Sequence, residues 1–157
     1  MNVRILLSAL LLAAGLTFVA GCGRNAEEKK VEEVKVDTPT EVAQKAIAAL
    51  KQQDFAAIAE LAYGKAQEDL MKHAAKFAEL KQAAESGNKA KKLQLAQVQK
   101  MFERISIEIK SENIDGEYAV VEVERVLDGR TSVDKMYLKN VNGEWKLVAE
   151  EEFAPAK

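Results

Sequence analysis

The fold is decided by residues 105–153, which read ISIEIKSENIDGEYAVVEVERVLDGRTSVDKMYLKNVNGEWKLVAEEEF. Ile105, Ile107 and Ile109 alternate with polar residues at its start, and this alternation is typical of a strand with one buried face. Asp-Gly and Asn-Gly pairs then separate the β-rich runs, and both residues of such pairs accept the positive φ that tight hairpins need. The pairs are Asp115-Gly116, Asp128-Gly129 and Asn142-Gly143. We therefore expect a four-stranded antiparallel meander whose later strands cover residues 118–127, 132–141 and 145–153.

The residues before this stretch follow a helical period. Thr38-Pro39-Thr40-Glu41 combines a capping box with proline at the first helical position, so it predicts the start of a helix. Further helices are expected over residues 54–61, 66–84 and 91–104, with Gly64 ending the first of these in a left-handed turn. Because helices come first and strands afterwards, the sequence predicts an α+β domain.

Residues 1–21 have the anatomy of a secretory leader. Arg4 precedes an apolar run from Ile5 to Val19, which is shorter than the roughly 20 residues that a membrane-spanning helix needs. An uncleaved membrane anchor is the alternative, but it gives no reason for a cysteine at the end of the run. Val19-Ala20-Gly21-Cys22 resembles the lipobox of bacterial lipoproteins. The resemblance implies cleavage before Cys22 and lipidation of its sulfur by a diacylglycerol, with palmitate among the acyl chains.

The lipobox resemblance also implies a location. Gly23, rather than Asp, follows Cys22 and resembles outer-membrane sorting, so we expect a lipid-anchored protein that faces the periplasm. In an organism without an outer membrane, the cytoplasmic membrane surface takes its place. Residues 22–37 are dense in Glu and Lys and are expected to form a tether, or alternatively a frayed extension of the first helix. Residues 38–157 then form a single domain.

Composition excludes several classes of protein. The chain has 157 residues with 23 basic and 25 acidic side chains, and removing Arg4 with the leader leaves 22 against 25. This balance predicts no nucleic-acid partner, which would need a clearly basic face. Cys22 is the only cysteine, so a lipidated chain has no thiol for a disulfide, a metal site or a nucleophile. Because the sequence also has no phosphate-binding glycine loop, we expect no cofactor and no metal.

Two short motifs resemble nuclear-transport-factor-2-like domains. Residues 142–148, NGEWKLV, are similar to the terminal hairpin of that superfamily, and Asp54-Phe55 resembles the start of its second helix. The resemblance covers about residues 38–153 and implies helices packed into the concave face of a curved, cone-like sheet. Small bacterial lipoproteins of unknown function share this layout. The superfamily includes isomerases, dehydratases, transport factors and inert accessory domains, so the resemblance does not choose a function.

Few side chains suggest chemistry. His73, the only histidine, is expected at the surface, with catalysis or metal ligation as the alternative. An isomerase of this superfamily would need a carboxylate base opposite a tyrosine or protonated aspartate in an apolar pocket. The tyrosines are Tyr63, Tyr118 and Tyr137, and the strand carboxylates are Glu122, Glu124 and Glu150 to Glu152. The pattern places these glutamates on a solvated sheet face.

The pattern predicts structural roles, rather than ligand contacts, for an aromatic residue and for a lysine-rich stretch. Trp145, Leu147 and Ala149 form one face of the last predicted strand, so Trp145 is expected in the core rather than at a ligand. Lys89-Ala90-Lys91-Lys92 is expected to be a solvated loop, with contact to anionic head groups as the alternative.

Two functions therefore stay open. The first is an envelope lipoprotein, with no catalytic residues, whose domain binds a small apolar ligand or an envelope protein. The alternative is an isomerase-like or dehydratase-like enzyme that uses a pocket carboxylate or His73. The residues that line the cavity between helices and sheet distinguish them, because only an enzyme needs an inward carboxylate or histidine opposite a donor.

Overall fold

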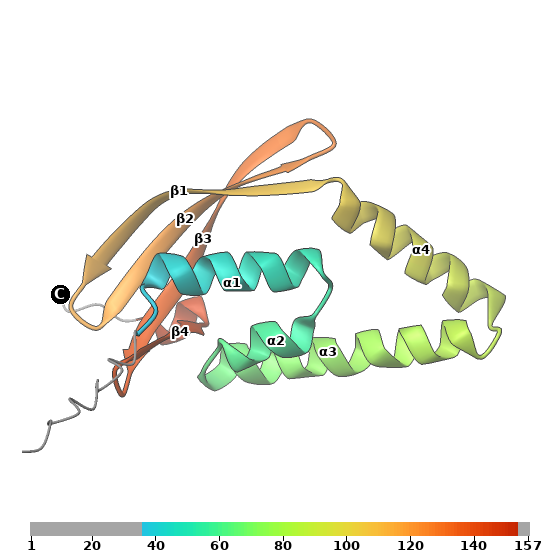
Figure 1. The fold of residues 1–157 in the computed structure, drawn as a ribbon, viewed down its shortest axis with the longest axis horizontal. Coiled ribbons are helices and arrows are strands. Elements are labelled where there is room, and N and C mark those ends of the chain that lie inside the picture. The colour runs from blue at the N-terminus through green and yellow to red at the C-terminus, as the bar shows by residue number, and fades with distance from the viewer. Residues whose placement is uncertain (1–35, 154–157) are drawn as a thin grey trace, which may run out of the picture. The chain divides into compact units, whose positions relative to one another are not determined.

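Helices come first and strands second in residues 36–153, the part of the chain that the computed structural model describes (Figure 1). The expected leader, Cys22 and residues 22–35 of the tether lie outside the described residues. The helices are α1 (Pro39–Lys51), α2 (Phe55–Glu60), α3 (Gly64–Glu85) and α4 (Lys89–Glu103). The strands are β1 (Ile105–Asp115), β2 (Tyr118–Leu127), β3 (Arg130–Val141) and β4 (Glu144–Val148), and a 3-10 turn, η1 (Glu150–Glu152), follows them. No helix in residues 36–153 is long and apolar enough to cross a membrane.

The strands form one antiparallel sheet in the order β1-β2-β3-β4, which confirms the predicted α+β meander. Asp128-Gly129 and Asn142-Gly143 are the two-residue turns of the later hairpins, and all four residues have positive φ. The first turn differs from the expected one. Asp115 pairs with Tyr118, so Gly116 and Glu117 form the turn, and only Gly116 has positive φ. A glycine at the first central position alone is the pattern of a type II′ turn.

The helices begin and end close to the expected residues. Thr38 and Glu41 form the predicted capping box at α1, where the Glu41 N–H donates to Thr38 Oγ1 at 3.2 Å.

The prediction that Gly64 ends the second helix is wrong. The chain between α2 and α3 runs along β4, because the Tyr63 N–H donates to the Leu147 carbonyl and the Leu147 N–H to that of Leu61. Gly64, at φ 61°, then turns the chain into α3.

The core lies between α1, α2 and the concave face of the sheet, which curves around α1 (Figure 1). Fully buried side chains from three elements meet there, namely Ala43 of α1, Val121 of β2 and Leu138 of β3. Trp145 packs half-buried against this core, on the same face of β4 as Leu147.

The last strand is shorter than expected. It ends at Val148, and residues 150–152 form η1 instead of continuing to Phe153. Contacts with distant residues favour this turn. The Glu152 carboxylate accepts the Lys65 N–H at the start of α3, and the Phe153 ring packs against Tyr118 and Tyr137. These contacts join Glu152 and Phe153 to the start of a helix and to the convex face of the sheet, respectively.

Candidate functional site

An apolar groove of about 350 Å³ lies between the helices and the concave face of the sheet. Its size falls within the roughly 300–1,000 Å³ that small-molecule sites occupy. The apolar lining comes from the helices and from the sheet, and comprises Ala46, Ile47, Leu50, Phe55, Ile58, Leu70, Ile107, Val123, Met136 and Leu147. The remaining lining residues are Arg125 and Asp134. The groove therefore offers a ligand an apolar surface with one polar position, formed by Arg125 and Asp134.

The sequence pattern of each element explains why these side chains meet. Ala46 and Leu50 are one helical turn apart on α1, so they project toward the same face. On the sheet, Val123 pairs with both Ile109 and Asp134, which places all three side chains on one face. Alternation along β2 then brings Arg125 to the same face as Val121 and Val123.

Arg125 and Asp134 form an ion pair at this groove. Arg125 Nε donates to Asp134 Oδ2 at 2.7 Å, and Nη2 donates to Oδ1 at 3.5 Å. The two side chains are 41% and 45% exposed, so the pair lies at the rim of the groove rather than in its depth. Register explains the pairing, because Arg125 lies opposite Ser132 and Asp134 is the next residue of β3 on the same face. The sequence analysis missed this pair. The alternation along the strand, however, places the Arg125 side chain on the same inward face as Val121 and Val123.

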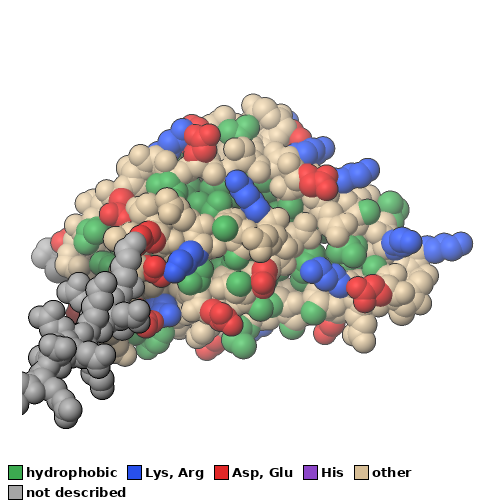
Figure 2. Space-filling view, viewed as in Figure 1, with side chains coloured by type: hydrophobic (Ala, Val, Ile, Leu, Met, Phe, Trp, Pro, Cys, Tyr) green, Lys and Arg blue, Asp and Glu red, His purple; other side chains and the backbone are tan. Residues whose placement is uncertain are grey.

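A second hollow adjoins the apolar groove. It lies between α1 and β1, measures about 530 Å³ and shares Ile47 and Ile107 with the apolar groove. Figure 2 shows hydrophobic side chains on the surface between α1 and β1, with Lys and Arg side chains nearby. Its lining also includes Gln44, Lys51 and Glu108, so this second hollow is mixed in polarity, unlike the apolar groove.

A larger hollow of about 540 Å³ separates α3 from α4 and contains His73. Its rim is charged and exposed, with Lys76, Glu79 and Lys91 beside the histidine. In residues 36–153, no group of three or more His, Cys, Asp or Glu side chains could hold a metal ion. His73 is exposed, as the sequence predicts, and the lysines around it suit a solvated surface. The apolar groove is therefore the stronger candidate site.

The tyrosines that an isomerase could use lie elsewhere. Tyr63 is exposed on the link between α2 and α3. Tyr118 and Tyr137 pack against Phe153 on the convex face, where the Tyr137 hydroxyl donates to Glu150 Oε1 at 3.1 Å. Desolvation by the surrounding protein raises the pKa of Tyr137, and Glu150 raises it further. The described structure therefore places no tyrosine opposite a carboxylate in the groove.

The expected strand carboxylates have structural partners. Glu122 and Glu124 lie on the convex face and pair with Lys135 and Lys110, respectively. Glu150 to Glu152 belong to η1 rather than to a strand, which corrects the prediction.

The residues expected as a solvated loop are helical. Lys89 to Lys92 form the first turn of α4, with Asn88 as its cap, instead of a loop. The α4 helix starts earlier than expected because the Asn88 side chain accepts the Lys91 N–H.

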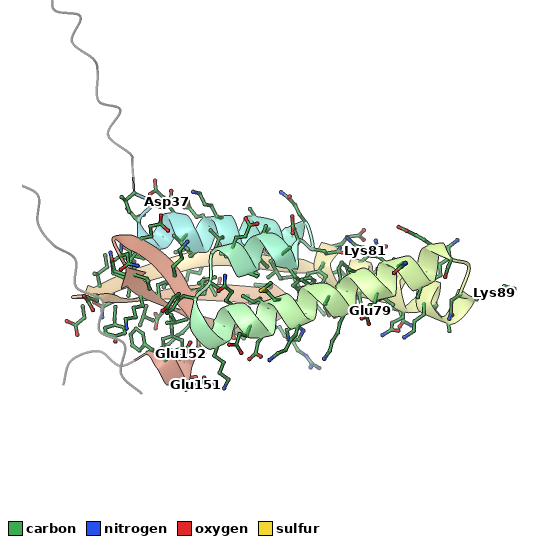
Figure 3. The ribbon with its side chains drawn as sticks, turned by 90° about the horizontal axis from the view of Figure 1, so that it is seen from below. Asp37, Glu79, Lys81, Lys89, Glu151 and Glu152 are labelled. Carbon is green, nitrogen blue, oxygen red and sulfur yellow. The ribbon has the colours of Figure 1, made fainter. Side chains whose placement is uncertain are left out.

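Two glutamates hold helix starts from far along the chain. Glu112 accepts the Thr40 N–H at 2.7 Å, and a bulge between Ile109 and Ser111 turns its side chain toward α1. Glu152 accepts the Lys65 N–H at 3.1 Å, and Glu151 beside it forms an ion pair with the Lys65 ammonium. Figure 3 shows Glu151 and Glu152 beside the start of α3. Neither role is visible in the sequence, because both depend on contacts across the folded domain.

Comparison with known proteins leaves the family open. No protein-family model matches the chain, and no curated protein matches its sequence. A crystal structure from Campylobacter jejuni, described as that of an NTF2-like transpeptidase, aligns with a TM-score of 0.45 and 12% identity. The alignment covers 73% of this chain and 100% of that chain. A likeness of this extent decides neither family nor activity. The resemblance to nuclear-transport-factor-2-like domains therefore stays a prediction.

Proposed function

We propose that this protein is a membrane-anchored envelope lipoprotein whose domain binds a small apolar ligand without catalysing a reaction. The lining of the groove carries the proposal, since every residue in it except Arg125 and Asp134 is apolar. Burying apolar ligand surface there would contribute about 25 cal/mol per Å². Such a surface favours apolar compounds over polar metabolites, which would leave their hydrogen bonds unmade.

The alternative is an isomerase-like or dehydratase-like enzyme, and the groove supports it less well. A base of this kind needs a carboxylate that is free to take a proton, opposite a group that stabilises the developing negative charge. Asp134 is the carboxylate in the lining, and Arg125 holds both of its oxygens. Asp134 therefore has the role of an ion-pair partner, which suits binding better than proton transfer.

Binding can be tested with apolar ligands and a variant of the groove wall. Ile47→Asn places a polar amide in the lining and should weaken ligand binding about tenfold, measured by calorimetry, since unpaired polar groups disfavour apolar contact. Leu93→Asn is the matched control, because Leu93 is 63% exposed on α4 and lies outside the groove. Equal binding by both variants would contradict a ligand site here. Measurable isomerase or dehydratase turnover that Asp134→Asn abolishes would support the enzyme instead.

The anchoring part of the proposal depends on the sequence around Cys22. Cys22→Ser removes the sulfur that the lipobox resemblance assigns to the lipid. We expect the variant to accumulate either in the soluble fraction or as an unprocessed precursor, as shown by fractionation and intact mass. His73→Ala, a surface change in the domain, should leave processing unchanged. Membrane retention and an unchanged mature mass in the Cys22→Ser variant would refute lipid anchoring at this residue.

A further inference from the structure

The one polar position in the apolar groove restricts which ligands fit. Among the described residues that line it, Arg125 and Asp134 are the only charged ones. Their side chains are about half exposed, whereas Val121 and Leu138 of the same sheet face are fully buried. A ligand that fills the groove therefore places its apolar body against the apolar residues of the helices and the sheet, and any polar group at the rim. This is the arrangement of an amphiphile with one head group.

The ion pair leaves hydrogen-bonding capacity for that head group. A guanidinium has five N–H donors, and Arg125 directs Nε and Nη2 toward Asp134. The described residues show no partner for Nη1 of Arg125. A carboxylate has about four acceptor positions, so Asp134 also retains acceptors beyond these two bonds. A hydroxyl or a primary amide can accept from the guanidinium and donate to the carboxylate.

The charge of the pair disfavours an ionised head group. Arg125 and Asp134 together carry no net charge, and their polar atoms are 2.7 Å apart. An anion that approaches Arg125 also approaches Asp134, and a cation that approaches Asp134 also approaches Arg125. Repulsion then offsets much of the attraction, while the ion still loses hydration. A neutral head group avoids both costs.

We propose that the groove selects neutral amphiphiles, with an apolar body and a hydroxyl or amide head held by Arg125 and Asp134, over ionised amphiphiles with the same body. This inference rests on the proposed ligand-binding function and adds the chemical class of the ligand. It also gives the ion pair a role in specificity, because removing either partner would expose an uncompensated charge to the ligand.

The test compares three probes that share one alkyl chain, namely 1-decanol, decanoate and decylammonium, below their aggregation concentrations. Residues 22–157 are expressed directly, without the leader and with Cys22→Ser, and binding is measured by calorimetry near pH 7. For the unaltered groove, decanol should bind about tenfold more tightly than either ion. Asp134→Asn leaves Arg125 unpaired, so decanoate should become the tightest ligand. Arg125→Gln leaves Asp134 unpaired, so decylammonium should become the tightest.

Two further variants separate specificity from folding. Asp128→Asn breaks the exposed pair with Arg104 at the turn between β2 and β3, outside the groove, and should leave all three affinities unchanged. The double variant Arg125→Asp with Asp134→Arg restores a neutral pair and should restore the preference for decanol. It keeps the test decisive if one of the single variants does not fold.

The possible results distinguish this inference from the function on which it rests. Preferences that follow the remaining charge in the single variants support it. Equal binding of all three probes, or preferences that do not change in Asp134→Asn and Arg125→Gln, would overturn the inference and leave apolar binding intact. If none of the probes binds the unaltered groove, the proposed ligand-binding function itself fails.

Discussion

Gly64 shows how a single residue can depend on a distant part of the chain. Its φ of 61° favours glycine, and a β-carbon there would lie 2.5 Å from Glu152 Oε1. That carboxylate accepts the Lys65 N–H at the start of α3, whose cap residue Tyr63 makes no side-chain cap bond. The glycine therefore leaves room for a cap that arrives from the end of the domain.

We expect Gly64→Ala to lower the free energy of unfolding by about 2 kcal/mol, of which about 1 kcal/mol is backbone strain and about 1 kcal/mol is loss of the cap. Gly116→Ala is the matched control, because Gly116 has a φ of 59° and no atom within 4 Å of the added carbon. It should lose only the strain component. Urea unfolding at neutral pH measures both.

A double-mutant cycle separates the two contributions. In a Glu152→Ala background the cap is already absent, so Gly64→Ala should cost no more than Gly116→Ala costs in the parent chain. A full loss from Gly64→Ala in that background would show that Glu152 plays no part.

At the scale of elements, η1 joins α3 to the sheet. The hydrogen bond and charge of Lys65 lower the pKa of Glu151, and Glu151 in turn raises the pKa of Lys65. A lowered carboxyl pKa contributes stability above the unfolded value, near 4.5, and this contribution is lost as the pH falls through the folded value. The raised lysine pKa contributes below its unfolded value, near 10.5, and that contribution is lost as the pH rises through the folded value.

Glu151→Gln should therefore change the pH dependence of stability more than its value at neutral pH, since both partners are exposed. We expect the parent chain to be slightly more stable than the variant at neutral pH. The difference should close as the pH falls below about 4 and again as it rises above about 11. Urea midpoints across this range measure the difference. Glu85→Gln is the control, because Glu85 lies at the far end of α3, the helix that contains Lys65. A difference that stays constant with pH would argue against the ion pair.

Across the whole described domain, an aromatic cluster links α4 to α2 and α3. Phe55 of α2 contacts Phe77 of α3 and Phe102 of α4 edge-on, with ring centroids 5.3 and 6.1 Å apart. Apart from this cluster, α4 packs mainly on α3 and has no fully buried residue. The stability of α4 therefore depends on few contacts.

Phe102→Ala should lower the free energy of unfolding by about 1–3 kcal/mol, less than for a fully buried phenylalanine, because Phe102 is only half-buried. Hydrogen exchange should show faster exchange in α4 and little change in β2 and β3. Met101→Ala is the control, because Met101 is the neighbouring residue and is 40% exposed. Uniformly faster exchange through the sheet would mean that α4 and the core unfold as one unit.

Local signals in the sequence were sufficient for the fold class, the capping box at Thr38 and the glycines of the three hairpin turns. Capping and turn chemistry act over a few residues, so these features are legible without the folded structure. The contacts of Glu112 and Glu152 with helix starts were not legible, since each links residues more than 70 positions apart. The last strand was predicted too long for the same reason, because Phe153 and Glu152 find their partners on β2, β3 and α3.

For the candidate site, too, some features can be predicted from the sequence and others depend on the tertiary structure. Alternation along β2 already indicates which side of the sheet Arg125 faces, and the apolar faces of the helices indicate a core. The pairing of Arg125 with Asp134, and the space left beside them, follow from strand register and from how closely the helices approach the sheet. Register and packing are set by the sum of many contacts across the domain, so only the tertiary structure decides where a groove remains and which side chains line it.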